Sequence, residues 1–251
     1  MTIGQVLEYL ARTVPAEAAE EWDNCGLQIG DPDRQCRSVL TCLDATPSVV
    51  AQAVAQGCEL IVSHHPVLFG NVRSLPVGEY TADVLAAATR GNVAIASAHT
   101  NLDACADGIN EQWMRLLDCK IESGAGACYR IGVASARKLC DLAERVADIC
   151  GERPRRIGDR DRLCSRICVA SGSGGRDEAW IEVLRAQAVD VFVSAEIKHS
   201  VARRLDYYGI AALETTHYAS ERIAADILAR RLADTGLTVR VADAEQSPYQ
   251  D

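Results

Sequence analysis

The chain has 251 residues, of which 48% are hydrophobic and 24% are charged. This composition is typical of a globular protein and excludes a chain that is disordered throughout. The formal net charge of −9 argues against a broad basic surface for nucleic acid, and no apolar stretch approaches the roughly 20 residues that cross a bilayer.

Helical and strand patterns alternate along the chain. Residues 2–14 are amphipathic, with Thr2 as N-cap and no basic segment, so we expect a helix there rather than a signal peptide. Thr46 and Pro47 mark the start of a helix after a strand at 39–43. Further strands are predicted at 58–63, 93–98, 129–134, 163–170, 189–193, 210–214 and 237–241. Further helices are predicted at 81–89, 107–117, 136–149, 177–188, 197–205 and 219–232.

This alternation predicts a mixed α/β fold in which helices flank the sheets. Residues 120–128 are rich in glycine and alanine, and residues 151–161 are rich in arginine, aspartate and glycine. We expect junctions in both segments. The two halves show no residue-level repeat.

The eleven cysteines are an odd number and include no CxxC pair. Several of them, such as Cys42, Cys58 and Cys168, lie inside apolar patterns. A disulfide framework and a thiolate zinc site are therefore not favoured. We expect buried, reduced cysteines in a cytoplasmic protein.

Two adjacent histidines, His64 and His65, follow the predicted strand at 58–63. Neighbouring side chains of a regular strand point to opposite faces, so two consecutive histidines converge on one site only where the strand ends. Pro66 ends it, because proline removes a backbone donor. Burying two imidazoles without partners would cost several kcal/mol. The doublet therefore predicts a pair of metal ligands.

Two other predicted strand ends carry further ligand types. His99 and Asp103 follow the strand at 93–98, and His217 follows the strand at 210–214 with Glu221 four residues later. The i, i+4 spacing places His217 and Glu221 on one face of a helix. In open α/β sheets, sites form beyond the carboxyl ends of the strands.

The set His64, His65, Asp103, His217 and Glu221 offers three imidazoles and two carboxylates. One zinc-like ion takes fewer ligands, so we expect two divalent ions, drawn from Zn, Mn, Fe, Co and Ni. Two such ions would lower the pKa of a bridging water and stabilise an oxyanion.

Other residues of these segments have open alternatives. His99 is a candidate catalytic residue or simply bonds to backbone, and Glu196 is either a catalytic acid or base or a carboxylate at a helix N-terminus. Asn101 and His199 are candidates for residues that orient the ligands. The glycine-rich segment 171–175 is better explained by a strand-to-helix turn than by a phosphate site, since it lacks the P-loop lysine.

Several motifs resemble the Nif-three-like dinuclear metal family, whose bacterial members are often labelled GTP cyclohydrolase 1 type 2 homologues. The resemblance rests on five segments that occur in the expected order and cover nearly the whole chain: 21–27 (EWDNCGL), 63–66 (SHHP), 99–103 (HTNLD), 170–175 (ASGSGG), and His217 with Glu221. One departure is Ala195, where relatives usually place a glycine before the acidic residue.

The resemblance implies that the five residues above bind two divalent metals. It also implies a single Nif-three-like unit without an inserted middle domain, made of two similar α/β lobes around a metal cleft. We place the lobes at 1–122 with a C-terminal strand at 235–245, and at 123–234. A toroidal homohexamer, with the sites facing an internal cavity, is implied as well.

From these observations we expect a dinuclear metal-dependent hydrolase that acts on a small nucleotide-like substrate through a metal-bridging water. The GTP cyclohydrolase activity comes from the resemblance alone. Phosphoester hydrolysis fits the same metal chemistry, and a non-enzymatic hexameric metal-binding scaffold or regulator is the alternative from another class. Nothing in the sequence indicates a membrane or nucleic-acid partner.

Overall fold

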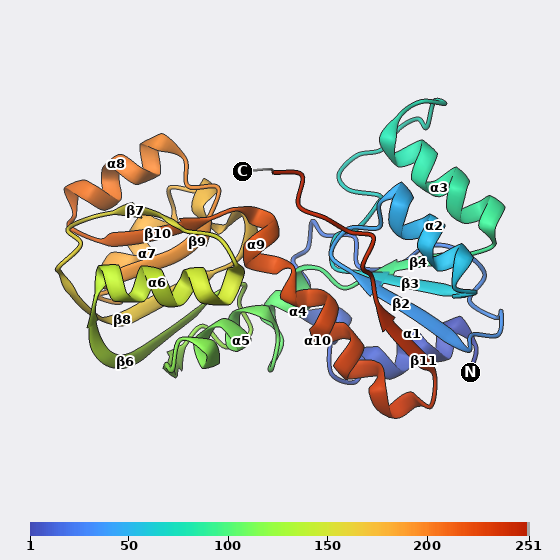
Figure 1. Ribbon diagram of the computed structural model, residues 1–251, viewed down its shortest axis with the longest axis horizontal. Helices are drawn as coiled ribbons and strands as arrows, with labels where there is room; N and C mark the ends of the chain where they lie inside the picture. Colours follow the sequence, from blue (N-terminus) through green and yellow to red (C-terminus); the bar gives the residue numbers. More distant parts are fainter. Residues whose placement is uncertain (250–251) are drawn as a thin grey trace. The chain divides into compact units, whose positions relative to one another are not determined.

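The computed structural model describes residues 1–249, and it confirms the predicted mixed α/β fold. The chain folds into two compact units, each with its own mixed sheet flanked by helices (Figure 1). Unit 1 contains Met1–Cys105 and the C-terminal segment that begins at Arg222, and unit 2 contains Ala106–Glu221. The unit boundaries therefore fall at 105/106 and 221/222, whereas the sequence placed the lobe boundaries at 122/123 and 234/235.

The sheet of unit 1 has the strand order β1-β4-β3-β2-β11. Strands β2, β3, β4 and β11 run parallel, and β1 is an antiparallel edge strand. The strands are β1 (Gly26–Ile29), β2 (Ser38–Cys42), β3 (Leu60–Ser63), β4 (Ala94–Ser97) and β11 (Thr238–Val241). Every residue of β2, β3 and β4 is buried, because helices cover both faces of this sheet.

Side-chain alternation divides the two faces of this sheet. Leu40, Ile61 and Ile95 pack with residues of α2 (Pro47–Ala55) and α3 (Tyr80–Gly91). On the other face, the Thr41 hydroxyl donates to the Ala225 carbonyl of α10 (Ile223–Leu232). Figure 1 shows α2 and α3 on one side of the strands and α1 (Ile3–Ala11) with α10 on the other. The remaining short helices of this unit are η1 (Ala16–Ala18), α4 (Thr100–Ala104) and η3 (Ala233–Thr235).

The predicted helix starts in unit 1 are confirmed. Thr2 caps α1 in a capping box with Gln5, and Thr46 caps α2 with Pro47 in its first turn. Gly57, with φ of +66°, follows the end of α2, where a left-handed conformation lets the chain turn back into the sheet.

The sheet of unit 2 has the strand order β5-β6-β8-β9-β10-β7. Strands β8, β9 and β10 run parallel, and β5, β6 and β7 pair antiparallel to their neighbours. The strands are β5 (Lys120–Ser123), β6 (Arg130–Lys138), β7 (Arg155–Ile157), β8 (Leu163–Ala170), β9 (Val191–Ala195) and β10 (Ala211–Thr215). The helices are α5 (Ile109–Leu116), α6 (Leu139–Cys150), η2 (Gly172–Arg176), α7 (Trp180–Ala186), α8 (His199–Tyr207) and α9 (His217–Glu221).

Several elements of the structure differ from the sequence prediction. The two segments expected to be junctions contain the strands β5 and β7, and the strand β1 and the helix α4 were not predicted either. All four elements are short. The strands β1, β5 and β7 lie at sheet edges, and their polar and apolar residues alternate only weakly. The helix predicted at 219–232 is α9 followed by α10, separated at Arg222. The Ser220 hydroxyl donates to the His217 carbonyl, which is a local alternative to continuous helix bonding.

The longest helices among the described residues, α3 and α6, have 12 residues each. A bilayer span needs about 20 residues. No helix within residues 1–249 is long and apolar enough to cross a membrane.

Candidate functional site

The carboxyl ends of three parallel strands in unit 1 bring the predicted ligands together. Asp44 follows β2, the histidine doublet follows β3, and His99 follows β4. Because β2, β3 and β4 run parallel, these residues leave the sheet at the same edge. The backbone N–H groups of His64 and His65 donate to the carbonyls of Cys42 and Leu43, so the chain remains paired for two residues beyond the strand.

The rings of His64, His65 and His99 form one cluster. Their centroids are 5.0 Å apart for His64 and His65, 5.1 Å for His64 and His99, and 5.5 Å for His65 and His99. Each ring offers one nitrogen, and these three nitrogens lie within 4.8 Å of one another. His64 is fully buried, and His65 and His99 are partly exposed. The cluster is therefore both desolvated and accessible from one side.

Oxygen acceptors fix the orientation and tautomer of all three rings. His64 Nδ1 donates to the Ala98 carbonyl at 2.8 Å, and His65 Nδ1 and His99 Nδ1 donate to carboxylates at the same distance. A neutral imidazole that donates from Nδ1 carries its lone pair on Nε2. This is the arrangement in which histidines bind metals, with the second nitrogen held by a carbonyl or carboxylate.

Asp103 joins this group from the short helix α4. Its Oδ1 atom lies 3.9 Å from His64 Nε2, beyond hydrogen-bond distance, and the side chain is only 10% exposed. Two ligands about 2.1 Å from one ion, on different sides of it, have a separation of this size. The spacing between His64 and Asp103 therefore fits a cation that both contact.

Asp23 orients His99, and sequence reasoning did not assign it a role. Asp23 Oδ1 accepts from His99 Nδ1 at 2.8 Å, while Oδ2 accepts from the Thr100 N–H at 3.0 Å and the Thr100 hydroxyl at 2.5 Å. Burial alone would raise the pKa of Asp23, but the hydrogen bonds from His99 and Thr100 outweigh it and hold the pKa well below its ordinary value. The signal was present, because Asp23 lies inside the 21–27 segment.

Asn101 lies in the same buried network. Cys25 Sγ is 3.2 Å from both Asn101 Oδ1 and Asp23 Oδ2. Burial raises the pKa of the Cys25 thiol to about 11, so this cysteine is neutral and poorly nucleophilic near pH 7. Asn101 therefore lies close to the Asp23 and His99 pair, and the single thiol proton of Cys25 can be donated to only one of the two oxygens.

The C-terminal segment supports the partner of His65. Glu245 accepts from the backbone N–H groups of Leu43 and Asp44 at 2.8 and 2.7 Å, and Asp44 Oδ1 in turn accepts from His65 Nδ1. Burial raises the pKa of Glu245, although the two backbone donors act against this shift. Neither Asp44 nor Glu245 was predicted, since 201 residues separate them in the sequence.

Unit 2 repeats the same edge arrangement with different residues. The glycine-rich segment follows β8, Glu196 follows β9 and His217 follows β10, and these strands are parallel neighbours. Glu221 lies one turn after His217 on α9, as predicted from the i, i+4 spacing. The structure therefore brings Glu196, His217 and Glu221 together.

His217 lies between two carboxylates. Its Nδ1 atom is 3.0 Å from Glu196 Oε1, and its Nε2 atom is 2.8 Å from Glu221 Oε2. A neutral imidazole has one N–H, so it satisfies only one of these two acceptors. Glu221 is 5% exposed at its side chain, and a cation shared by Nε2 and this carboxylate resolves the mismatch.

Gly172 permits the close approach of Glu221. A Cβ built on Gly172 would overlap the Glu221 carboxylate, and the φ of +60° also favours glycine. The Gly172 N–H donates to the Ser220 hydroxyl at 2.9 Å. The glycine-rich segment forms the 3-10 turn η2, which agrees with the strand-to-helix turn favoured in the sequence.

Glu196 and His199 differ in their surroundings. Glu196 has a φ of +52°, which is costly for a residue with a Cβ and turns its carboxylate toward His217. Its other oxygen is 3.2 Å from Arg176 Nε. His199 is exposed at the start of α8, and its side chain forms no hydrogen bond or ion pair within residues 1–249, so the structure does not bring it to this group.

The donor sets of both units suit divalent metals. Imidazole nitrogens and carboxylate oxygens bind Zn, Mn, Fe, Co and Ni, and no thiolate takes part. The described histidine and carboxylate clusters can hold metal ions. Fold and site together define a mixed α/β protein with histidine and carboxylate groups that can hold metal ions near the carboxyl ends of parallel strands.

The chain belongs to the Duf34/NIF3 (NGG1p interacting factor 3) family, whose model matches residues 1–248. A Lactococcus lactis protein named GTP cyclohydrolase 1 type 2 homolog is 29% identical over 98% of this chain and 97% of its own length. A Helicobacter pylori protein named GTP cyclohydrolase 1 type 2 is 28% identical over 92% of this chain and 91% of its own length. The crystal structure of a Bacillus cereus protein related to NIF3 has the same fold, with a TM-score of 0.90 and 16% identity over 100% of this chain and 99% of that one.

Proposed function

We propose that this protein is a metal-dependent hydrolase that acts on a small nucleotide-like substrate. His64, His65, Asp103, His217 and Glu221 would bind two divalent ions as a dinuclear centre. The observation that carries this proposal is the common orientation of the histidines. His64 Nδ1 bonds to a carbonyl, and His65 and His217 each bond through Nδ1 to a carboxylate, so that Nε2 is the ligand atom of all three.

The five proposed ligands are three imidazoles and two carboxylates, which is more than one zinc-like ion normally takes and suits two ions. When bound, the ions would supply Lewis acidity and lower the pKa of water. GTP ring opening is one candidate reaction, in line with the names of the relatives.

His99 is the candidate proton acceptor. With Nδ1–H bonded to Asp23, its Nε2 atom is free to take a proton, and the Asp23 carboxylate stabilises the imidazolium that results. Glu196 orients His217 and is the second candidate acid or base. We place the protein in the cytoplasm and, from the resemblance, in a toroidal homohexamer. Sedimentation should then give six times the chain mass of 27.0 kDa.

Metal analysis tests the centre. Purified protein should hold more than one equivalent of divalent metal per chain, and either His64→Ala or His217→Ala should remove most of it. If each variant lost only one ion and kept the other, the two ligand sets would bind separate ions. Full metal retention in His64→Ala would refute the assignment.

A substrate screen tests the activity. Metal-loaded protein should hydrolyse a nucleotide, and Asp103→Ala should abolish the hydrolysis, because its carboxylate is a ligand. Activity that survives in Asp103→Ala would indicate a contaminant. Cleavage of phosphoesters without attack on the base ring would favour a phosphoesterase. Metal binding with no activity would favour a scaffold or regulator.

A further inference from the structure

Two largely exposed aromatic side chains lie beside His99. Trp22 is 62% exposed and Phe69 is 56% exposed. The ring centroids are 5.9 Å apart for Trp22 and Phe69, 6.1 Å for Trp22 and His99, and 5.9 Å for Phe69 and His99. Exposing two large rings next to each other in a chain with 5% aromatic residues has a solvation cost, which a ligand stacked on them would offset.

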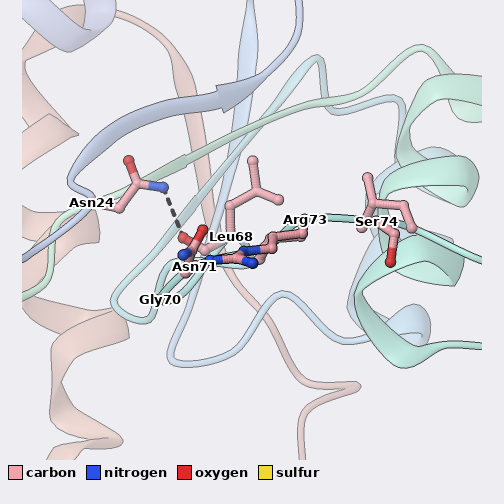
Figure 2. Close-up of a pocket in the computed structure, with 8 residues that line it drawn as sticks. Asn24, Leu68, Gly70, Asn71, Arg73 and Ser74 are labelled. Atoms are coloured by element: carbon pink, nitrogen blue, oxygen red, sulfur yellow. Dashed lines mark hydrogen bonds between the residues drawn. The ribbon is translucent and has the colours of Figure 1, made fainter.

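A pocket is lined by residues that are close to Trp22 and Phe69 in the sequence. It has a volume of about 450 Å³, which is within the range of small-molecule sites. Its walls are Asn24, which follows Trp22 and Asp23 in the sequence, and residues on both sides of Phe69 (Figure 2). The lining residues are Asn24, Leu68, Gly70, Asn71, Val72, Arg73, Ser74 and Leu75.

Two side chains of the neighbouring segment form hydrogen bonds with the backbone of Leu68, which lines the pocket. Asn24 Nδ2 donates to the Leu68 carbonyl at 2.7 Å, the bond drawn in Figure 2, and the Leu68 N–H donates to Gln28 Oε1 at 3.3 Å. These bonds tie the 68–75 loop to the segment that carries Trp22 and Asp23. Phe69 is therefore held in place next to His99 although its loop has no regular secondary structure.

Arg73 is the only charged residue that lines the pocket. It is exposed and forms no ion pair within the described part of the chain. In Figure 2 its side chain points along the loop toward Asn71 and away from Ser74. A planar guanidinium without an internal partner, in a chain of net charge −9, is suited to bind a phosphate.

We propose that this pocket binds the nucleotide substrate, with the phosphates on Arg73 and the base stacked on Trp22, edge-on to Phe69, whose ring lies at 83° to that of Trp22. This inference rests on the proposed function and sharpens it. The base, and not the phosphate, lies beside His99 and the histidine doublet in this arrangement. The pocket therefore favours hydrolysis at the ring over cleavage of a phosphoester.

Binding measurements test the two halves of the pocket separately, using GTP, guanosine and tripolyphosphate as probes on the full-length protein treated with a chelator. Calorimetry gives the dissociation constants. Arg73→Gln should weaken GTP and tripolyphosphate binding about tenfold and leave guanosine binding unchanged, because a charge-assisted bond is lost. Trp22→Leu should weaken GTP and guanosine binding about five- to tenfold, because the base loses its stacking partner. Phe69→Leu should weaken both by a smaller factor, about threefold, because only an edge contact is lost.

Matched controls lie elsewhere on the surface. Arg90→Gln removes an exposed arginine at the end of α3, and Tyr207→Leu removes an aromatic ring that is 82% exposed in unit 2. Both should bind all three probes as the unaltered protein does. If Arg73→Gln and Trp22→Leu also bind GTP normally, or if the unaltered protein binds no probe, the proposal is wrong. Binding of tripolyphosphate without guanosine would leave an anion site only and refute the base-stacking part.

The experiment separates this proposal from the proposed function. Because binding is measured without metal, the expected pattern together with no hydrolysis in the metal-loaded protein would reject the hydrolase and keep the pocket. Conversely, nucleotide hydrolysis with unchanged KM in Arg73→Gln and Trp22→Leu would reject the pocket and keep the hydrolase.

Discussion

The two units place histidines and carboxylates at the same kind of sheet edge, but they hold them by different means. In unit 1, His64 is oriented by the backbone carbonyl of Ala98, and His99 by Asp23, whose side chain is fully buried. In unit 2, His217 is oriented by Glu196, whose side chain is 36% exposed and paired with an exposed Arg176. Histidines lie at the sheet edge in both units because parallel strands end there, whereas the rigidity of each imidazole ring depends on the group that accepts its hydrogen bond.

In unit 2, close packing helps to fix the position of a site residue, whereas in unit 1 hydrogen bonds from buried partners do so. Gly172 brings backbone against the Glu221 carboxylate, and no side chain fits between them. Unit 1 instead fixes its ligand rings by hydrogen bonds from residues distant in the sequence. We therefore expect a small change in volume to disturb unit 2, and a change of charge or acceptor to disturb unit 1.

The largest effect is expected for Gly172→Ala. The added Cβ would displace Glu221, lowering metal affinity about a hundredfold. We also expect the free energy of unfolding to fall by about 2 kcal/mol beyond the backbone strain, because the site is already filled. Gly126→Ala is the matched control, since Gly126 also has a positive φ, +78°, but nothing lies within 4 Å of its built Cβ. Metal titration and denaturation of both variants give the comparison, and equal behaviour would contradict it.

An intermediate effect is expected when the partners of the ligand rings lose their charge. Glu196→Gln and Asp44→Asn should each lower metal affinity about tenfold, because a carboxylate partner raises the basicity of the imidazole that binds the metal. His199→Ala is the control and should leave the affinity unchanged, because the His199 side chain is exposed and forms no hydrogen bond or ion pair in the described chain. Competition with a metallochromic chelator measures all three. An unchanged metal affinity in Glu196→Gln would show that Glu196 does not support the His217 ring and only forms an ion pair with Arg176.

A smaller, pH-dependent effect is expected for Asp23→Asn. Hydrogen bonds lower the pKa of Asp23 in the folded protein, so its carboxylate stabilises the fold above the unfolded pKa of about 3.9. This contribution is lost as the pH falls below that value toward the lower folded pKa. Asp23→Asn should reduce the free energy of unfolding by about 1 kcal/mol near neutral pH.

The size of that reduction should stay constant down to about pH 5 and shrink below about pH 4. Urea denaturation of both proteins across this range measures it. Asp190 of unit 2 is the comparison, because its pKa is also lowered by backbone N–H donors but its side chain is 30% exposed. Asp190→Asn should have a smaller effect, and an equal or larger one would contradict the role of burial.

Several features of both units could be predicted because they are local in the sequence. The doublet at a strand end, the i, i+4 pair of His217 and Glu221, and the caps Thr2 and Thr46 each depend on residues within a few positions. The short elements β1, β5, β7 and α4 could not be predicted in this way, since an edge strand forms only when a neighbouring strand offers its backbone groups.

The partners of the histidines were beyond sequence reasoning for a related reason. Asp23 is 76 residues from His99, and Glu245 is 202 residues from the Leu43 N–H to which it bonds. Asp23 lies inside the 21–27 segment, but nothing in that segment indicates its distant partner, and nothing near Glu245 distinguishes it from a solvated carboxylate. The same holds for Arg73 and Phe69, which read as an ordinary polar loop until the structure places them beside a pocket and His99.

The sequence by itself was enough to predict the fold class and the family, because hydrophobic periodicity and strand-end motifs depend on neighbouring positions, and both predictions are confirmed. The metal-ligand residues stay a prediction. Only the tertiary structure decided which nitrogen of each ring presents its lone pair, and why Gly172 must be a glycine. These features depend on contacts between segments far apart in the chain. Hydrogen bonds of 2.8 Å orient the His65 and His99 rings, and there is no room for a methyl group on Gly172.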